Sequence, residues 1–173
     1  NFMKNVIYPL LRNADNPSGV ELHHIEMYLQ GKHWDIVQKV ILERKGNLRE
    51  MPDIIHPVTK AKISSRELLD EGHENYWETL IKREIEEYGG DPSLGLAKAK
   101  LGAEKTRDLY AEMREELHLD GFISREQRDE MARDFEWYNP IDYVEYAEGA
   151  KTPGDRSGRI VADSQGTSTA YLT

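Results

Sequence analysis

The stretch VELHHIEMYLQGKHWDIVQKVILERKGN, residues 20–47, decides the fold that we predict for this chain. Its apolar side chains recur at steps of three and four, the spacing of one face of an α-helix. This line contains Leu22, Ile25, Leu29, His33, Ile36 and Val40. Gly31 lies inside it and costs about 1 kcal/mol relative to Ala, so a break or kink can occur there. Lys-Gly-Asn supplies the stop, and we expect a helix from about Val20 to Lys45.

Two further helices have clear start and stop signals. Ser64-Ser65-Arg66-Glu67 is a capping box, in which a hydroxyl and a carboxylate bind each other's unpaired backbone amides. Gly89-Gly90 ends that helix. Asp91-Pro92 starts the next one with an N-cap and a favoured first residue, and it continues to about Leu119. The line through Leu94, Ala97 and Leu101 predicts part of its buried face.

The rest of the chain is predicted to be a short helix over residues 2–12, a connector and a fifth helix. Prolines at positions 52 and 57 oppose helix, so we expect residues 48–62 to be extended. Ser124 and Gln127 form a second capping box, and Pro140 prevents that helix from continuing.

Residues from Gly149 onwards are rich in Gly, Ser and Thr and show no helical period, so they should not fold alone. We therefore predict an all-α fold, a bundle of about five helices with two or three long antiparallel ones and an extended C-terminal tail. We expect a helical domain over residues 1–147, excerpted from a longer chain. A tail over residues 148–173 is expected to be ordered by a partner.

Composition limits the function classes. The 173 residues carry a net charge of −9, and acidic and basic residues alternate along the predicted helices. An acidic surface repels phosphate backbones, so we expect the body of the protein not to bind nucleic acid. The chain has no cysteine, which excludes thiolate metal sites and cysteine nucleophiles. No apolar run of about 18 residues is present, so no membrane segment is expected.

The histidines are the sharpest candidates for chemistry. His23, His24, Asn47 and His56 follow loosely the order found in metal-dependent HNH-type nucleases, and a nuclease that uses them is the alternative function. However, adjacent residues of a helix point about 100° apart, so we expect His23 and His24 not to bind one ion. Paired carboxylates in such helices are expected to face solvent. We therefore predict no catalytic, cofactor-binding or metal-binding residues and no cofactor, with His33 as a core histidine.

Aromatic residues after the fifth helix are the candidates for an interaction surface. A large aromatic side chain suits an anchor in a core or an interface. Together with two arginines of the tail that can contact another protein, the candidates are Trp137, Tyr138, Pro140, Ile141, Arg156 and Arg159.

The order of several motifs resembles helical segments of the large polyvalent proteins of bacteriophages and related mobile elements. The first part of the pattern is matched by Tyr28, Lys32-His33, Glu43-Arg44 and Asn47. The second part, a Gly-x-Ile-Ser-x-Glu-Gln helix leading into Tyr-x-Pro-Ile, is matched by Gly121, Ile123, Ser124, Glu126, Gln127, Tyr138, Pro140 and Ile141. A basic, glycine-containing stretch follows, and the resemblance spans roughly Tyr8 to Arg159.

The resemblance implies a non-enzymatic structural or interaction region of a giant, multi-domain, virion-associated protein that is ejected into the host with the genome. It implies a location in the virion and then in the host cytoplasm, although the parent chain can carry enzymatic modules. The implied partners are other virion proteins or other regions of the same chain. An inhibitor of host defence, whose acidic surface mimics nucleic acid, is a third alternative.

Overall fold

The computed structural model describes residues 1–47, 49, 51–63, 76–134 and 136–137, and this part of the chain is mostly helical, as predicted. In chain order its elements are the short helical turns η1 (Met3–Ile7) and η2 (Tyr8–Leu10), α1 (Leu22–Glu43), β1 (Ile54–Ile55), β2 (Lys62–Ile63), α3 (Tyr76–Glu87), α4 (Pro92–Leu119) and α5 (Arg125–Asp134). None of the described helices has the length and apolar content needed to cross a membrane. The predicted tail and the capping box at Ser64 lie outside the described residues.

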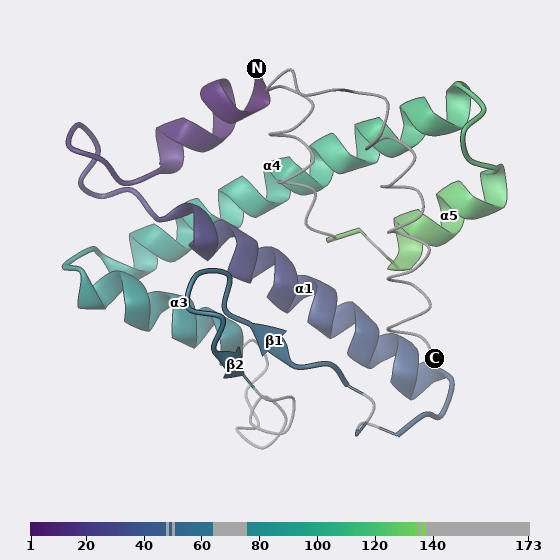
Figure 1. Cartoon of the computed structure of the whole chain (residues 1–173), viewed down its shortest axis with the longest axis horizontal. Coiled ribbons are helices and arrows are strands. Elements are labelled where there is room, and N and C mark those ends of the chain that lie inside the picture. The colour runs from purple at the N-terminus through teal and green to yellow at the C-terminus, as the bar shows by residue number, and fades with distance from the viewer. Residues whose placement is uncertain (48, 50, 64–75, 135, 138–173) are drawn as a thin grey trace.

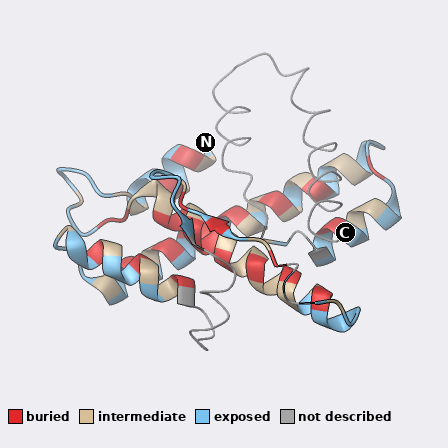
Figure 2. Cartoon of the chain, turned by 60° about the horizontal axis from the view of Figure 1, so that its bottom comes forward, coloured by how far each residue is buried: buried red, intermediate tan, exposed pale blue. Residues whose placement is uncertain are grey.

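Helix α1 is the centre of the structure. It packs against both α3 and α4, and the short antiparallel pair β1–β2 lies along it (Figure 1). Its N-terminal half is buried on more than one side, which Figure 2 shows as red along the ribbon. In its C-terminal half the buried residues are Trp34, Val37 and Ile41. The prediction that Ile36 and Val40 belong to the core was wrong, because the buried face there is shifted by one residue.

Helix α4 approaches its neighbours through small residues. Gly95 faces Ile85 of α3, and Gly102 faces Ile25 of α1; a Cβ at either glycine would lie 2.6 Å from the isoleucine Cδ1. By contrast, Leu94 and Leu101 are exposed, so the predicted buried line of α4 was wrong. Glycines and not leucines occupy the buried face of α4, because the close packing of two helix backbones leaves room only for small side chains.

The predicted helix ends are confirmed where the structure describes them. The side chain of Asp91 accepts a hydrogen bond from the backbone N–H of Leu94 at 3.0 Å, as an N-cap does. Ser124 and Gln127 bind each other's backbone N–H at 3.0 and 2.8 Å, which is the reciprocal capping box. Gly121 ends α4 with a φ of +80°, a conformation that glycine adopts without strain.

Gly31 does not break α1, although its low helix propensity makes a break or kink possible there. The helix is continuous, and the face of the Trp77 ring from α3 lies directly on the Gly31 backbone, where a Cβ would overlap ring atoms. Tyr28 packs edge-on against the same ring, with 4.7 Å between centroids. Glycine at position 31 is therefore a packing requirement of the α1–α3 contact and outweighs its low helix propensity.

We predict that Gly31→Ala lowers the free energy of unfolding by about 1–3 kcal/mol, because the added methyl group displaces Trp77. Helix propensity alone would change it by about 1 kcal/mol in the opposite direction. Lys39→Ala, at an exposed position of the same helix, is the control and should stay within about 0.5 kcal/mol of the parent. Urea unfolding followed by circular dichroism measures both. A stabilised Gly31→Ala variant would contradict the packing argument.

Candidate functional site: a histidine–glutamate joint

Two separate elements bring histidines to a carboxylate on a third element. His23 and His24 lie in the first turn of α1, His56 lies in the turn between β1 and β2, and Glu84 lies on α3. We call His23, His24, His56 and Glu84 the His–Glu joint. The ring centroids of His23 and His24 are 4.2 Å apart, and those of His23 and His56 are 5.1 Å apart.

The expectation that His23 and His24 do not bind one ion rested on their side chains pointing apart, and this reason was wrong. Both lie on a helix, as expected, but their Nε2 atoms are 3.1 and 3.5 Å from the same oxygen, Oε1 of Glu84. The angle of about 100° between adjacent residues holds at Cβ. An imidazole ring extends far enough beyond Cβ for two side chains to turn toward one point.

Glu84 is the centre of the His–Glu joint. Its carboxylate also lies 3.2 and 3.0 Å from Nε2 of His56, through Oε1 and Oε2. Burial by itself would raise the pKa of Glu84, but hydrogen bonds from His23 and His56 outweigh burial and lower that pKa below its ordinary value. The carboxylate is therefore ionised at neutral pH and accepts hydrogen bonds from imidazole N–H groups.

The backbone fixes which nitrogen of His24 carries hydrogen. Its Nδ1 accepts a hydrogen bond from the backbone N–H of Glu21 at 3.2 Å, so in neutral imidazole the hydrogen lies on Nε2. That N–H faces the Glu84 carboxylate. His24 is fully buried, and burial, followed by repulsion from His23, lowers its pKa from 6.5 to about 4. His24 is therefore neutral at pH 7.

His56 is fixed in the same way by its own turn. Its Nδ1 accepts hydrogen bonds from the backbone N–H groups of Val58 and Thr59, at 3.2 and 3.1 Å. This geometry resembles an Asx turn, in which a side-chain acceptor organises the two or three residues that follow. The hydrogen of neutral His56 therefore lies on Nε2, which donates it to Glu84.

These hydrogen positions decide whether the cluster suits a metal ion. One ligand atom each from His23, His56 and Glu84 lies within 4.8 Å of the others, a spacing compatible with a shared cation. A histidine that binds a metal presents a lone pair on one nitrogen and donates the N–H of the other. His56 has the opposite arrangement, because its Nδ1 lone pair is occupied and its Nε2 carries the hydrogen. His24 shares this arrangement, so neither ring offers the lone pair of Nε2 to a divalent metal.

Asn47, the fourth residue of the nuclease alternative, is far from the joint. It follows the C-terminal end of α1, whereas His23 lies at the N-terminal end, and 22 helical residues span roughly 33 Å. Its side chain accepts a hydrogen bond from the backbone N–H of Arg49. The predicted nuclease set is therefore not assembled in one place.

Of the predicted interaction residues, Trp137 is described and packs against this chain's own core. The guanidinium of Arg107 lies 4.6 Å from the centroid of its ring, and Nζ of Lys32 lies 5.9 Å from it. These cation–π contacts hold the end of α5 near α1 and α4. The remaining candidates lie outside the described residues, namely Tyr138, Pro140, Ile141, Arg156 and Arg159.

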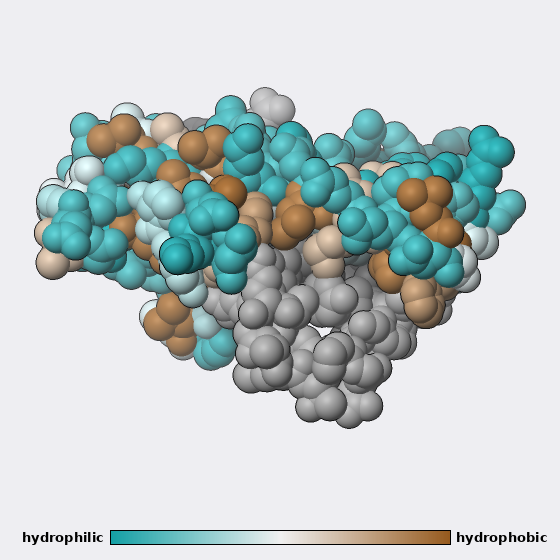
Figure 3. Space-filling view, turned by 90° about the horizontal axis from the view of Figure 1, so that it is seen from above, coloured by the Kyte–Doolittle hydropathy of each residue, from teal (hydrophilic) through white to brown (hydrophobic). Residues whose placement is uncertain are grey.

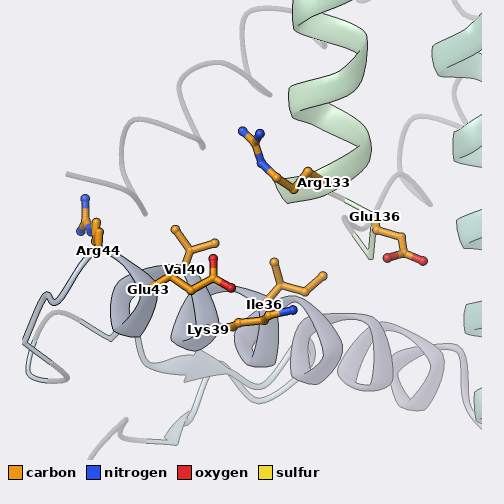
Figure 4. Close-up of a pocket in the computed structure, with 7 residues that line it drawn as sticks. All are labelled: Ile36, Lys39, Val40, Glu43, Arg44, Arg133 and Glu136. Carbon is orange, nitrogen blue, oxygen red and sulfur yellow. The ribbon is translucent and has the colours of Figure 1, made fainter.

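A cleft of about 650 Å³ lies between the C-terminal half of α1 and the end of α5 (Figure 4). Ile36 and Val40 form its apolar wall, which explains why these two residues are absent from the core. Charged residues of both signs surround them, namely Lys39, Glu43, Arg44, Arg133 and Glu136. The cleft therefore combines an apolar centre with a mixed-charge rim.

Glu84 is the residue of the joint that the sequence prediction missed. It lies in the charged run KREIEE, whose carboxylates were expected to face solvent. However, Trp77, Ile81, Glu84 and Tyr88 follow one another at steps of four, three and four, so Glu84 falls on the apolar line of α3. A carboxylate on such a line is the signal that could have identified it.

Comparisons of the chain with protein-family models, with curated proteins and with solved structures gave no match.

We predict that imidazole ¹⁵N spectra at pH 7 show hydrogen on Nε2 and a lone pair on Nδ1 in both His24 and His56. The cause is the backbone N–H groups that face Nδ1 of both rings. His118 is an internal comparison, because its Nδ1 lies 3.3 Å from the carbonyl oxygen of Ile123 and so carries hydrogen itself. Hydrogen on Nδ1 of His56 would contradict the exclusion of a metal.

We predict that Glu84→Gln lowers the free energy of unfolding by about 1–3 kcal/mol, because the neutral amide offers one acceptor oxygen where the carboxylate offers two. Imidazole donors of the joint then lose their charged acceptor. Glu87→Gln, an exposed position on the same helix, is the matched control and should change little. Urea unfolding at pH 7 measures both variants. Equal stability of the two variants would show that the joint contributes nothing.

Proposed function

We propose that this chain is a non-enzymatic helical region of a large phage virion-associated protein, one that enters the host with the genome. The observation that carries the proposal is that the histidines of the His–Glu joint contact Glu84 and the backbone of this chain. The Nε2 atoms of His23 and His56 are hydrogen-bonded to Glu84, and the Nδ1 atoms of His24 and His56 accept hydrogen bonds from the backbone. This histidine cluster ties three elements together, and the Nδ1 lone pairs of His24 and His56 are occupied by backbone N–H groups and so are not free for a metal or a substrate.

The order of motifs along the sequence supports the phage part of the proposal. The Tyr28 and Lys32-His33 pattern lies on α1, and the Gly-x-Ile-Ser-x-Glu-Gln pattern forms the turn and cap that start α5. We further propose that the long helices form an antiparallel bundle, and that residues 148–173 are a tail ordered by a partner. In this proposal the protein is located in the virion and later in the host cytoplasm.

The surface of the described residues supports protein partners, either other virion proteins or other regions of the same chain. On the face in Figure 3, hydrophilic residues dominate and hydrophobic ones form small separate groups. Leu119 and Phe122, at the turn between α4 and α5, are 74% and 70% exposed. The cleft beside Ile36 adds an apolar centre with a charged rim, which is the general composition of a protein interface.

Mass spectrometry of purified particles of the phage that encodes this chain tests the proposal. We expect peptides from residues 1–137 in the particle, and the same region in the cytoplasmic fraction of cells soon after infection. Absence of the parent protein from purified particles would contradict the proposal.

The nuclease alternative is tested separately by incubating the 173-residue chain with plasmid DNA and Mg²⁺, Mn²⁺ or Zn²⁺. We expect no cleavage, because His56 and His24 present N–H groups where a metal requires lone pairs. Cleavage that disappears in His24→Gln would replace the structural proposal with an enzymatic one.

A further inference from the structure

We propose that the His–Glu joint is a proton-operated latch, which releases the start of α1 and the β1–β2 turn from α3 when the pH falls. The second proton of His24 or of His56 has to bind Nδ1, the atom that already accepts backbone N–H groups. A protonated ring therefore cannot keep its place in the closed joint. This latch does not depend on the proposed location in a virion.

The His24 half of the latch is coupled to the start of α1. The backbone N–H of Glu21, the N-cap residue, has Nδ1 of His24 as its acceptor at 3.2 Å. A proton on that nitrogen would direct two N–H groups at each other. Because the ring is fully buried, it cannot turn toward water while the first turn of α1 stays packed.

The neighbours of His24 within the joint act on its protonation in two directions. Glu84 favours a positive charge, whereas His23 and His56 oppose it. Burial is the largest influence and also opposes it, so the pKa of His24 is lowered to about 4. The pKa of Glu84 is lowered as well, by its hydrogen bonds to His23 and His56 and by the charges of the histidines, so the carboxylate also resists protonation.

Charged and titratable groups on the surrounding elements do little to stabilise a protonated His24. Tyr88, the residue directly after α3, has its ring centroid 5.9 Å from that of His24, and burial raises its pKa, so it stays neutral in acid. The guanidinium of Arg12 lies 4.3 Å from the centroid of the Tyr88 ring. Lys98 of α4 is bound to a backbone carbonyl before α1. Glu21 adds a carboxylate at the N-cap, paired with Arg12 at 3.8 Å.

The His56 half of the latch is coupled to the β1–β2 turn. Two backbone N–H groups, of Val58 and Thr59, share Nδ1 of His56 as their acceptor. The turn is further closed by hydrogen bonds between the backbones of His56 and Ala61 and of Lys60 and His56. A proton on Nδ1 would remove the acceptor of both N–H groups. The new ring N–H would then repel the two backbone N–H groups that point at it.

The sign of the pH dependence follows from the protons bound by the open and closed forms. In the open form His24 titrates near 6.5, and in the closed form near 4. Between these values the open form binds a proton that the closed form lacks, so opening becomes about tenfold more favourable per pH unit. Glu84, with its lowered pKa, adds a further loss of stability only as the pH falls below its ordinary value of 4.5.

Release should be local, because the other end of the structure has a separate core. Tyr110, Ile123 and Met131 form a second apolar cluster between α4 and α5. The histidine near it, His118, has Nδ1 facing the carbonyl of Ile123, so a second proton on this ring does not meet a backbone N–H. The contact between α4 and α5 should therefore stay intact when the joint opens in acid, and it serves as an internal reference for the measurement.

Amide hydrogen exchange of the 173-residue chain at pH 7, 6, 5 and 4.5, corrected for intrinsic rates, tests the latch. We expect protection at Glu21 to fall by about tenfold per pH unit below pH 6.5, while protection at Tyr110 changes much less. Protection at Val58 and Thr59 should fall as well, because a proton on Nδ1 of His56 removes their acceptor. Imidazole NMR of the same sample should show that protonation of His24 follows the loss of protection at Glu21.

Two substitutions remove the titrating atom and keep the cap. His24→Gln places at the third helical position a residue that serves in capping boxes, and His56→Asn places an Asx-turn residue in the turn. The double variant should lose the pH dependence at Glu21, Val58 and Thr59. His118→Gln, the matched control, should retain it.

Either of two results in the parent protein would overturn the proposal, even if the double variant does not fold. One is protonation of His24 and His56 while the three amides stay protected. The other is an equal loss of protection at Tyr110 and at the joint, which would indicate ordinary acid unfolding. In a folded double variant, an unchanged pH dependence would overturn it too.

Discussion

Glu84 places a carboxylate on the apolar line of α3, next to the fully buried side chain of Ile85, and the arrangement around it follows from that position. A partly buried charge is costly unless hydrogen bonds replace the water that it loses. Imidazole Nε2 groups from α1 and from the β1–β2 turn take over this role. The position of the turn against α3 and the orientation of the first turn of α1 are both constrained by this one side chain.

Close approach of helix backbones is the second constraint, and it acts on the same elements. Gly31 allows the Trp77 ring to lie on α1, and Gly102 allows Ile25 to lie on α4. Ile25 directly follows the two histidines of α1, so the depth at which α4 packs also sets how His24 is buried. The polar joint and the apolar core are therefore parts of one packing arrangement, which explains why a charged group is tolerated there.

Local signals in the sequence were sufficient to predict helix ends, but they did not identify the buried faces. Asp91, Ser124 and Gln127 act through atoms two or three residues away, so their roles can be recognised without knowledge of the fold. In contrast, Leu94 is exposed and Gly95 is buried because of what α3 presents to α4. Hydrophobicity alone predicts that the leucine is buried and the glycine exposed, which is the reverse of what the structure shows. The space between the two helices decides which residue fits, and the local sequence does not specify that space.

The histidines illustrate why convergence alone does not define a site. Spacing along a helix predicted that His23 and His24 diverge, and their side chains instead meet at Glu84. Convergence is also what a metal centre requires, so the positions of the rings do not distinguish a cation from a carboxylate. The distinction lies at Nδ1 of His24 and His56, where backbone N–H groups assign the hydrogen to the opposite nitrogen. A ring whose inward nitrogen carries hydrogen is a donor, so its natural partner is an anion, and Glu84 supplies that anion from within the chain.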